Sequence, residues 1–477
     1  MRNTNSGNGG AGEKTGSTPK RFALVHMGND VSYGLLFVAG EFLGQGHAVK
    51  WFDSEEADVV SNISAWEPDF ACFSPMSTFF LQAQKLAKTL KEVLPNVKSV
   101  FGGVHVLAVP ECIESDAIDI AVIGPVYGTV DDIIEAKSNA TIRGTPASCD
   151  RMRPDVRDYY FSIPRMANRH RKYIMSHFGC MYHCSYCSTT LLRKHYGVEA
   201  YKKYWMTRRP VTHLIDEAKV LLEINTKEVS LEDDDVLAGT DAEAWLDSFA
   251  QAWKKEIGLP MYANVTPQTV VKASDEVLKT LASLVNSVQM GVQTARPDSL
   301  KLFHRSFQRE AQVKEAYDRL RSFDIKVKLE VIIGLPVQDP IGDALDTIKL
   351  CQRIAPGGFT ACFPLMLYPG TALYKKCLAE GVPLSDHCEF EWHSGEGSVK
   401  FDPETARRIK NLTKMATMFV KYNIDEAWMR AFIDMELTES ASKRLSECAY
   451  LESLVFRLGE GARKDFDKIL SGMHFRY

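Results

Sequence analysis

The sequence predicts an α/β protein with an N-terminal doubly wound parallel sheet, a partial (β/α)6 barrel and a helical C-terminal region. Two successive series of short apolar runs alternate with stretches of helical length, which is typical of parallel sheets covered by helices. After about residue 402 the strand pattern ends and apolar residues recur at helical spacing. We therefore divide the chain into a disordered tail (1–20), the doubly wound domain (21–140), a linker (141–172), the barrel (173–375) and a helical cap (376–477).

The composition of the 477 residues is that of an ordinary globular protein, with 45% hydrophobic and 25% charged residues. The net charge of −4, from 57 basic and 61 acidic residues, gives no reason to expect a nucleic-acid partner. No run of about 18 to 20 uncharged apolar residues is present, so we expect no membrane span. The 11 cysteines form an odd number in a chain without an export signal, which favours reduced thiols and a cytoplasmic location.

The first series predicts a small sheet with helices on both faces, preceded by a tail rich in Gly, Ser, Thr and Asn that we expect to be disordered. The expected strands are 22–27, 48–52, 69–74, 99–103 and 118–123. The expected helices end near 44–46, span 81–94 and begin at about 129. Ligands of such sheets bind beyond the carboxyl ends of the strands, so the candidate rim is 27–29, 74–76, 102–105 and 124.

The linker is basic and contains three prolines, so it is either a contact for a phosphate or substrate or a solvated connector. The second series follows it and predicts six strand-helix units with their chemistry at the carboxyl-terminal rim. The expected strands are 172–176, 228–231, 261–265, 288–292, 326–333 and 360–367. Beyond the barrel, apolar residues such as Ile409, Leu412 and Phe419 recur at helical spacing and predict the helical cap.

Three of the cysteines lie within eight residues, in a loop directly after an expected strand, in the pattern Cys180-x-x-x-Cys184-x-x-Cys187. Three thiolates on one short loop can bind three irons of a cubane cluster, which leaves the fourth iron free for an external ligand. An open metal position is typical of a catalytic site. A zinc site would need a fourth ligand, and only His183 is close; the remaining alternative is three ordinary buried cysteines.

The loop resembles the cysteine motif of the radical S-adenosylmethionine (SAM) superfamily, with Tyr186 as the aromatic residue before the last cysteine. Later segments resemble other strand motifs of that family: the acidic end of the second strand (231–236), the fourth-strand motif (291–294), the fifth strand (332–336) and the sixth (367–371). The resemblance implies that Cys180, Cys184 and Cys187 hold a [4Fe-4S] cluster whose unique iron is chelated by SAM. One-electron reduction would then cleave SAM to methionine and a deoxyadenosyl radical.

The same resemblance points to side chains that would bind SAM. Asp233 and Asp234 are candidate acceptors for its ammonium group, while Gln293 and Thr294 can hydrogen-bond the ribose or the methionine end. The alternatives are a capped helix start for the aspartates and polar pairing within the core for the glutamine.

The first domain resembles the cobalamin-binding domain that precedes many radical SAM barrels. The match lies in Ser74, in the pair Gly102 and Gly103, and in the following segment with His105. It implies that these residues line the slot for the nucleotide tail of cobalamin, since small residues let the backbone approach a flat ligand. The motif Asp-x-His-x-x-Gly is absent after the first strand, so no histidine ligand to cobalt is expected. The loop 124–128 reads Gly-Pro-Val-Tyr-Gly in place of the usual Gly-Glu-Gly-Glu.

These resemblances imply a cobalamin-dependent radical SAM enzyme, a C-methyltransferase acting on an unactivated carbon of a natural-product or cofactor precursor. One SAM would remethylate cobalamin and another would be cleaved, while the protein sets distances and excludes water. The alternatives are a cobalamin-free radical SAM enzyme that catalyses cyclisation, rearrangement or oxidation, and a non-catalytic iron–sulfur electron-transfer protein. The expected partners are a small-molecule or peptide substrate and an external one-electron reductant such as flavodoxin or ferredoxin; no catalytic side chain is assigned.

Overall fold

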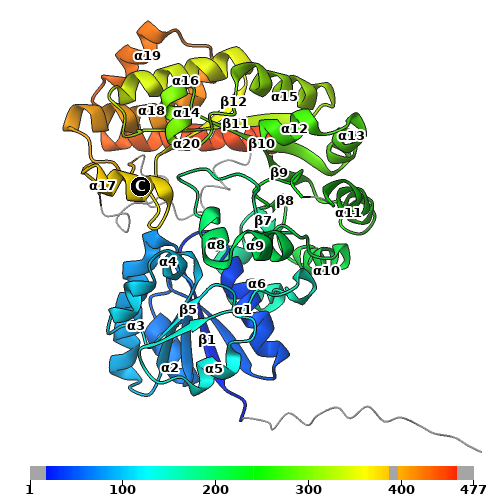
Figure 1. The fold of residues 1–477 in the computed structure, drawn as a ribbon, viewed down its shortest axis with the longest axis vertical. Helices are drawn as coiled ribbons and strands as arrows, with labels where there is room; N and C mark the ends of the chain where they lie inside the picture. Colours follow the sequence, from blue (N-terminus) through cyan, green and yellow to red (C-terminus); the bar gives the residue numbers. More distant parts are fainter. Residues whose placement is uncertain (1–17, 240, 386–395, 459–477) are drawn as a thin grey trace, which may run out of the picture.

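The computed structural model describes residues 18–239, 241–385 and 396–458, and shows two parallel sheets with a group of helices beyond the second sheet (Figure 1). Most of the expected N-terminal tail, residues 1–17, lies outside the described residues, as do 386–395 and 459–477 of the expected cap. In the described ranges, no helix is long and apolar enough to cross a bilayer.

The N-terminal domain is the expected doubly wound sheet, with six parallel strands in the order β2-β1-β3-β4-β5-β6. Its strands are β1 (Arg21–His26), β2 (Ala48–Asp53), β3 (Phe70–Phe73), β4 (Lys98–Phe101), β5 (Ile120–Ile123) and β6 (Ala140–Arg143). Its helices are α1 (Tyr33–Gly44), α2 (Val59–Trp66), η1 (Ser77–Phe79), α3 (Phe80–Val93), α4 (Gly103–Ala108), η2 (Pro110–Glu114) and α5 (Val130–Glu135). The edge strand β6 is an addition to the five strands that the sequence predicts.

Strand β1 lies inside this sheet and shows why both faces are covered. All of its residues after Arg21 are buried. On one face Phe22 stacks on Phe42 of α1 and on Phe70 of β3, with ring centroids 3.9 and 4.8 Å apart. On the other face Val25 belongs to a separate buried cluster that includes residues of α3. With both faces filled, the carboxyl edge of the sheet is left for a ligand.

The segment expected to be a linker carries regular structure. Residues 141–172 include η3 (Cys149–Arg151), α6 (Val156–Ser162) and α7 (Pro164–Ala167), and they lead into β7 (Arg171–Ile174). The Asp155 side chain caps α6 by accepting a hydrogen bond from the Asp158 N–H. Arg165 donates to Asp53 of β2 through Nε (2.9 Å) and Nη2 (2.7 Å). This arginine therefore joins the segment to the first sheet, and its charge is neutralised within the chain.

The second domain is a half-barrel in which six parallel strands pair in sequence order, β12-β11-β10-β9-β8-β7, which confirms the expected partial (β/α)6 barrel. After β7, its strands are β8 (Glu228–Leu231), β9 (Met261–Val265), β10 (Val285–Gln293), β11 (Lys326–Ile333) and β12 (Phe359–Pro364). Its helices are α8 (Thr189–Tyr196), α9 (Val198–Trp205), α10 (Val211–Leu221), α11 (Ala242–Glu256), α12 (Pro267–Lys272), α13 (Asp275–Leu284), α14 (Pro297–Leu302), α15 (Glu310–Ser322), α16 (Pro340–Ile354) and α17 (Ala372–Ala379).

The concave side of the half-barrel is polar. Along β11, every second residue is buried against the helices, whereas Lys328 and Glu330 face the other way and keep some access to solvent. Tyr262 of β9 lies beside them, because the Lys328 Nζ is 6.0 Å from the centre of its ring. The Tyr262 hydroxyl donates to Gln289 Oε1 of β10 (2.6 Å), and Gln289 in turn donates to Glu330.

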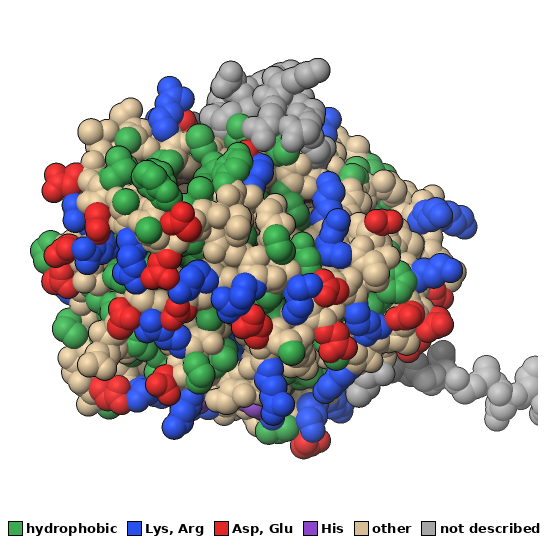
Figure 2. Space-filling view, turned by 90° about the horizontal axis from the view of Figure 1, so that it is seen from above, with side chains coloured by type: hydrophobic (Ala, Val, Ile, Leu, Met, Phe, Trp, Pro, Cys, Tyr) green, Lys and Arg blue, Asp and Glu red, His purple; other side chains and the backbone are tan. Residues whose placement is uncertain are grey.

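Three helices follow the barrel: α18 (Pro403–Lys421), α19 (Glu426–Ile433) and α20 (Glu439–Leu458). The last of them, drawn in red in Figure 1, lies across the amino ends of the barrel strands. Lys326 at the start of β11 donates to the Phe456 carbonyl (3.0 Å), and Phe359 at the start of β12 stacks on the Phe456 ring. Arg457 forms an ion pair with Glu228 at the start of β8. On the face seen in Figure 2, charged side chains of both signs are interspersed.

Candidate active site

The loop between β7 and α8 carries the three motif cysteines, Cys180, Cys184 and Cys187. Its backbone is fixed from two sides. The Cys180 N–H donates to the Tyr201 hydroxyl of α9 (2.7 Å), which donates back to the Cys180 carbonyl (3.0 Å). The Ser185 hydroxyl donates to the Leu302 carbonyl at the end of α14 (2.6 Å). The loop is therefore anchored to α9 on one side and to α14 on the other.

The thiols of this loop are free and at least partly buried. Burial raises the pKa of Cys187 to about 12 and raises that of Cys180 further, with the Asp234 charge as the second cause at both positions. Within the described part of the chain, no three His, Cys, Asp or Glu side chains converge on a point that a single metal ion would occupy. A cubane cluster places its three protein ligands on three different irons, so such convergence is not required.

Arg305 provides a physical test of whether an anionic cluster fits here. Its side chain is only 4% exposed, and it forms no ion pair with an Asp or Glu among the described residues. Its Nη1 lies 3.4 Å from Cys184 Sγ, while its Nη2 donates to the Gly291 carbonyl (3.1 Å) and to Gln308 Oε1 (2.8 Å). A buried cation without an anionic partner is strongly unfavourable. The donor set therefore fits a negatively charged cluster bound through Cys184.

Asp233, which follows β8, is fully buried and serves the chain itself. Its carboxylate accepts hydrogen bonds from the Ser176 N–H (2.7 Å), the His177 N–H (3.2 Å) and Arg208 Nη1 (2.8 Å). Burial opposes its ionisation, but His177 and then Arg208 hold the pKa of Asp233 well below its usual range. These contacts fix the start of the cysteine loop. The Asp233 oxygens already accept hydrogen bonds, so a SAM ammonium group would have to share them. The binding of this ammonium group by Asp233 stays a prediction.

Asp234 has the opposite environment. It is accessible to solvent, and its single hydrogen bond within the described residues comes from the Thr189 hydroxyl at the start of α8 (3.1 Å). The surrounding protein raises the pKa of Asp234 to about 6 through burial, with Asp233 and Asp235 adding to the effect. The neighbouring Asp235 accepts from two threonine hydroxyls of the α12 region at 2.8 Å each. Of the three aspartates, Asp234 therefore has the carboxylate with most capacity for a ligand.

Gln293, the last residue of β10, also has features of a binding residue. Its backbone is in the left-handed region (φ +68°), which is strained for a side chain of this kind. Its side chain folds over Gly291, where a Cβ atom would lie 2.4 Å from Gln293 Nε2. Its Oε1 is buried and has no hydrogen-bond partner in the described structure. Buried amide oxygens are normally satisfied, so an absent ligand is the simplest partner.

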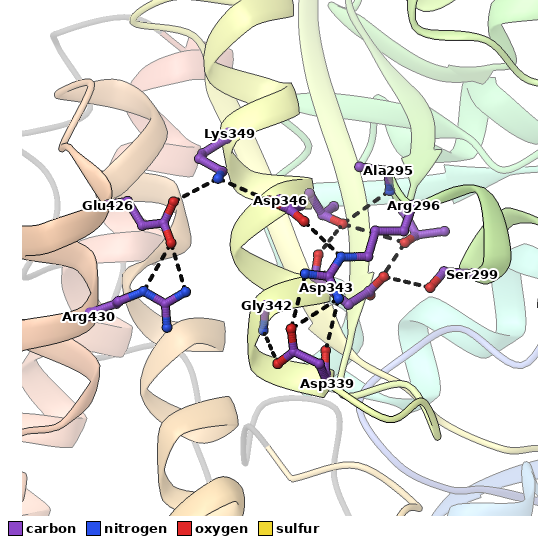
Figure 3. Close-up of polar contacts among 12 residues, drawn as sticks. Ala295, Arg296, Ser299, Asp339, Gly342, Asp343, Asp346, Lys349, Glu426 and Arg430 are labelled. Carbon is purple, nitrogen blue, oxygen red and sulfur yellow. Dashed lines mark hydrogen bonds and ion pairs between the residues drawn. The ribbon is translucent and has the colours of Figure 1, made fainter.

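Thr294 points into a different network, around the start of α16. Its hydroxyl lies 3.5 Å from Asp343 Oδ2, and Ser299 donates to the other oxygen of Asp343 (2.5 Å). Figure 3 shows this network continuing to Arg296, which donates to Asp346 (2.7 Å). The structure thus gives Thr294 a contact that ties β10 to α16, and its proposed contact with SAM stays a prediction.

Other unpartnered polar atoms lie beyond the carboxyl ends of the barrel strands. The His177 Nε2, after β7, and both amide atoms of Gln268, in α12 after β9, are buried without hydrogen-bond partners in the described structure. Together with Gln293 they mark one rim as the place of a polar ligand, which fits SAM. The sequence carries no spacing signal for Gln268, His177 or Arg305, because they lie in three segments that are far apart in the chain.

The carboxyl edge of the first sheet has a corresponding glycine-lined floor. Ser74 follows β3, and Gly102 and Gly103 follow β4. Gly103 has φ +84°, and a Cβ atom there would lie 2.4 Å from Ser74 Oγ; one at Gly34 would lie 2.9 Å from the same atom. No side chain other than glycine fits these positions without displacing Ser74. The close approach fits the slot expected for cobalamin.

His105 lies behind this floor. It is buried, its Nδ1 is 2.9 Å from Ser77 Oγ, and its ring stacks on Phe80 with centroids 3.8 Å apart. These contacts are those of a packing residue, and a ligand-lining role for His105 stays a prediction.

Helix α8 connects the two rims. It starts directly after the cysteine loop and ends on the first sheet, where the Tyr196 hydroxyl donates to the carbonyls of Ile123 (3.1 Å) and Gly144 (2.9 Å). His195 Nε2 lies 2.9 Å from the Leu107 carbonyl of α4. Gly124, in the variant loop, accommodates this helix, since a Cβ there would lie 1.8 Å from the Tyr196 oxygen. The two carboxyl edges therefore face each other across a short helix.

Two family models match the chain, each over one domain. The B12 binding domain matches residues 23–134, and the Radical SAM superfamily matches residues 174–351. An uncharacterized methyltransferase of Pyrococcus horikoshii is 23% identical over 429 residues, which cover 80% of this chain and 86% of the relative.

Solved structures share the architecture. The radical SAM methyltransferase TsrM from Kitasatospora setae, solved with tryptophan substrate and a SAM analogue, superposes with a TM-score of 0.65 over 95% of this chain and 99% of TsrM, at 13% identity. The cobalamin-dependent SAM radical enzyme OxsB, solved with aqua-cobalamin and SAM, gives a TM-score of 0.63 over 95% and 78%, at 10% identity. At these identities the likeness concerns the fold.

The family matches and the geometry agree on the cofactors. A radical SAM domain implies a [4Fe-4S] cluster and SAM, and a B12-binding domain implies cobalamin. The buried Arg305 beside Cys184, the unpartnered polar atoms of the barrel rim and the glycine floor at Ser74 fit these three groups. The chain carries a B12-binding domain followed by a radical SAM domain.

Proposed function

We propose that this enzyme is a cobalamin-dependent methyltransferase that methylates an unactivated carbon of a natural-product or cofactor precursor. The observation that carries the proposal is the position of α8, which contacts the cysteine loop at one end, where the Thr190 hydroxyl donates to the Cys187 carbonyl (2.7 Å), and the edge of the B12-binding domain at the other. Gly370, after β12, adds a second contact, since a Cβ there would lie 3.0 Å from the Ala108 carbonyl of α4. A methyl carrier and a radical source would thus lie on the two sides of one gap.

The names of the relatives support the same activity. The Pyrococcus horikoshii relative is called a methyltransferase, and TsrM, which shares the fold, is described as a radical SAM methyltransferase. We extend this reaction class to the present chain because both cofactor-binding rims are built from its own residues.

When bound, the cofactors supply a transferable methyl group and a radical that abstracts hydrogen. The chain's part is to hold and orient them. Asp234 offers a carboxylate to the ammonium group of SAM, and Gln293 offers its unpartnered Oε1 to a hydroxyl or amine of the same molecule. Tyr182, within the cysteine loop, stacks on Phe307 with ring centroids 5.2 Å apart.

The substrate is a small molecule or a peptide that enters the concave side of the half-barrel. The charged pair Lys328 and Glu330 on that side favours a polar substrate over a purely apolar one. The electron for the cluster comes from an external one-electron reductant, for which flavodoxin or ferredoxin is the natural choice in a cell.

The test combines metal content with product analysis on protein expressed with cobalamin and purified without oxygen. We expect about four irons and about one cobalt per chain, together with formation of deoxyadenosine and S-adenosylhomocysteine from SAM. Cys184→Ala should lose iron and deoxyadenosine formation but keep cobalt. Gly103→Val should lose cobalt and keep iron, because its side chain would meet Ser74.

Gly46→Val is the matched control for Gly103→Val. Gly46 also has a positive φ (+85°) and lies in the same domain, but a Cβ atom there meets nothing within 4 Å. It should therefore retain cobalt despite similar backbone strain. Wild-type protein that binds iron without cobalt would contradict the proposal and leave the cobalamin-free radical enzyme. Retained SAM cleavage in Cys184→Ala would contradict any radical SAM mechanism at this loop.

A further inference from the structure

We propose that Arg305 is the fixed counter-charge of the iron–sulfur cluster and raises its reduction potential. Arg305 is outside the cysteine motif and 118 residues or more from it in sequence, yet its Nη1 is 3.4 Å from Cys184 Sγ. The inference concerns how the cluster is tuned, so it holds whether or not the enzyme transfers methyl groups.

The backbone places Arg305 by a defined helix ending. His304 has φ +57°, and the N–H groups of His304 and Arg305 donate back to the carbonyls of Lys301 (3.1 Å) and Leu300 (2.7 Å). This pair of bonds is the Schellman motif, in which the chain reverses just after a helix. The reversal at the end of α14 turns the Arg305 side chain inward, under the cysteine loop that packs on the same helix end.

The guanidinium is then held rigidly. Its Nη2 donates to the Gly291 carbonyl of β10 (3.1 Å) and to Gln308 Oε1 (2.8 Å). Gln308 is itself fixed, because its Nε2 donates to the Val292 carbonyl (2.7 Å). A charge that is fixed on both sides cannot move away when the charge of its neighbour changes.

A comparison with the other buried arginines shows what Arg305 lacks. Among the described residues, three arginines are buried: Arg208, Arg209 and Arg305. Arg208 lies 2.8 Å from Asp233 and Arg209 lies 2.8 Å from Glu217, so each has a carboxylate. Arg305 is hydrogen-bonded only to neutral acceptors and the sulfur of Cys184 in the described structure, and Glu330 interacts with its charge without forming an ion pair. Since arginine stays protonated in proteins, a thiolate with its cluster is the anion that balances this charge.

The positive charge of Arg305 affects the reduction potential of the cluster. Reduction adds one electron from an external donor to the cluster, with no bond made or broken. A buried cation in contact with a cluster ligand favours the more negative, reduced state and raises the potential. Arg305 is placed to have this effect because it contacts a cluster ligand directly, with Nη1 3.4 Å from Cys184 Sγ.

The test is an EPR-monitored redox titration of the anaerobic, cluster-loaded enzyme. Arg305→Gln should retain iron but shift the midpoint potential to a more negative value, and Arg305→Lys, which keeps the charge, should restore most of the shift. Arg353→Gln is the control, because Arg353 is paired with Glu310 on the outside of α15 and α16 and should leave the potential unchanged. An iron-loaded Arg305→Gln protein with the wild-type potential would overturn the proposal, since a merely structural arginine predicts that result.

A second measurement tests the contact directly in the wild-type enzyme and uses Arg305→Lys only to assign the signal. Enzyme labelled with ¹⁵N-arginine, reduced and examined by pulsed EPR, should show a weak ¹⁵N coupling to the cluster. Arginine labelling reports Arg305 specifically if the signal disappears in Arg305→Lys. Absence of a ¹⁵N coupling in the wild-type enzyme would refute the contact on which the proposal rests.

Discussion

Replacement of Asp233 by asparagine tests the separation of structural and ligand-binding carboxylates at the barrel rim. The change leaves Arg208, which is fully buried, without its anion, and weakens the hydrogen bonds from Ser176 and His177. Removing one partner of a buried ion pair costs about 3–5 kcal/mol. For a domain of roughly 200 residues this corresponds to a fall in Tm of roughly 6–20 °C. Calorimetry of the cluster-loaded protein, wild type against Asp233→Asn, measures it.

Asp234→Asn is the matched control, one residue away. Asp234 is accessible, accepts a single hydrogen bond from Thr189 among the described residues and has a raised pKa of about 6, so Asp234→Asn should not lower stability at pH 7 while it weakens SAM binding. The pH dependence adds a second check. The pKa of Asp233 is lowered by folding, so its contribution is present above about pH 4 and is lost only in stronger acid. An Asp233→Asn protein within about 1 kcal/mol of wild type at pH 7 would refute this reasoning.

Two further variants test the rim and the concave face. Gly291→Ala should displace the Gln293 side chain and weaken SAM binding about tenfold, as measured by equilibrium dialysis on cluster-loaded protein. Gly44→Ala is the control, because a Cβ atom there meets nothing within 4 Å. Equal SAM affinities of the Gly291→Ala and wild-type proteins would contradict the role of Gln293. Burial lowers the pKa of Lys328 to about 8 against an unfolded value of about 10.4, so the folded state loses this proton first and wild-type stability should rise between pH 8 and 10. Lys328→Met should lack this rise, and a difference between the two melting curves that does not change with pH would argue against it.

Most of the fold follows from the sequence because both sheets are built from regular strand-helix units. Strand β11 has the predicted bounds, since polar and apolar residues alternate along most of its eight residues as expected for a strand. Strand β6 escaped prediction because it is an edge strand of four residues with half of them exposed. The helices α6 and α7 lie among prolines and arginines, whose local signal is that of a loop, and they form because buried residues such as Tyr159 and Tyr160 pack on the first domain.

The site was predictable where its residues are close in sequence. The three cysteines share one loop, and their spacing together with the resemblance to the radical SAM motif predicts a cluster. Asp233 and Asp234 are adjacent and chemically identical, and only the structure shows that one is enclosed by Arg208 and the other faces solvent. The sequence does not predict the role of Arg305, because the helix end that orients its side chain and the cysteine sulfur that it contacts lie in distant segments.

The helix across the amino ends of the half-barrel has a consequence for biosynthesis. Helix α20 contacts the first residues of β8, β11 and β12 through Phe456 and Arg457, and it comes after all six strands in the chain. On the ribosome the B12-binding domain can fold early, since its six strands precede the cysteine loop. The barrel, by contrast, stays open at its base until this last helix emerges. The cysteine loop is therefore translated long before the helix that closes the opposite end of its barrel.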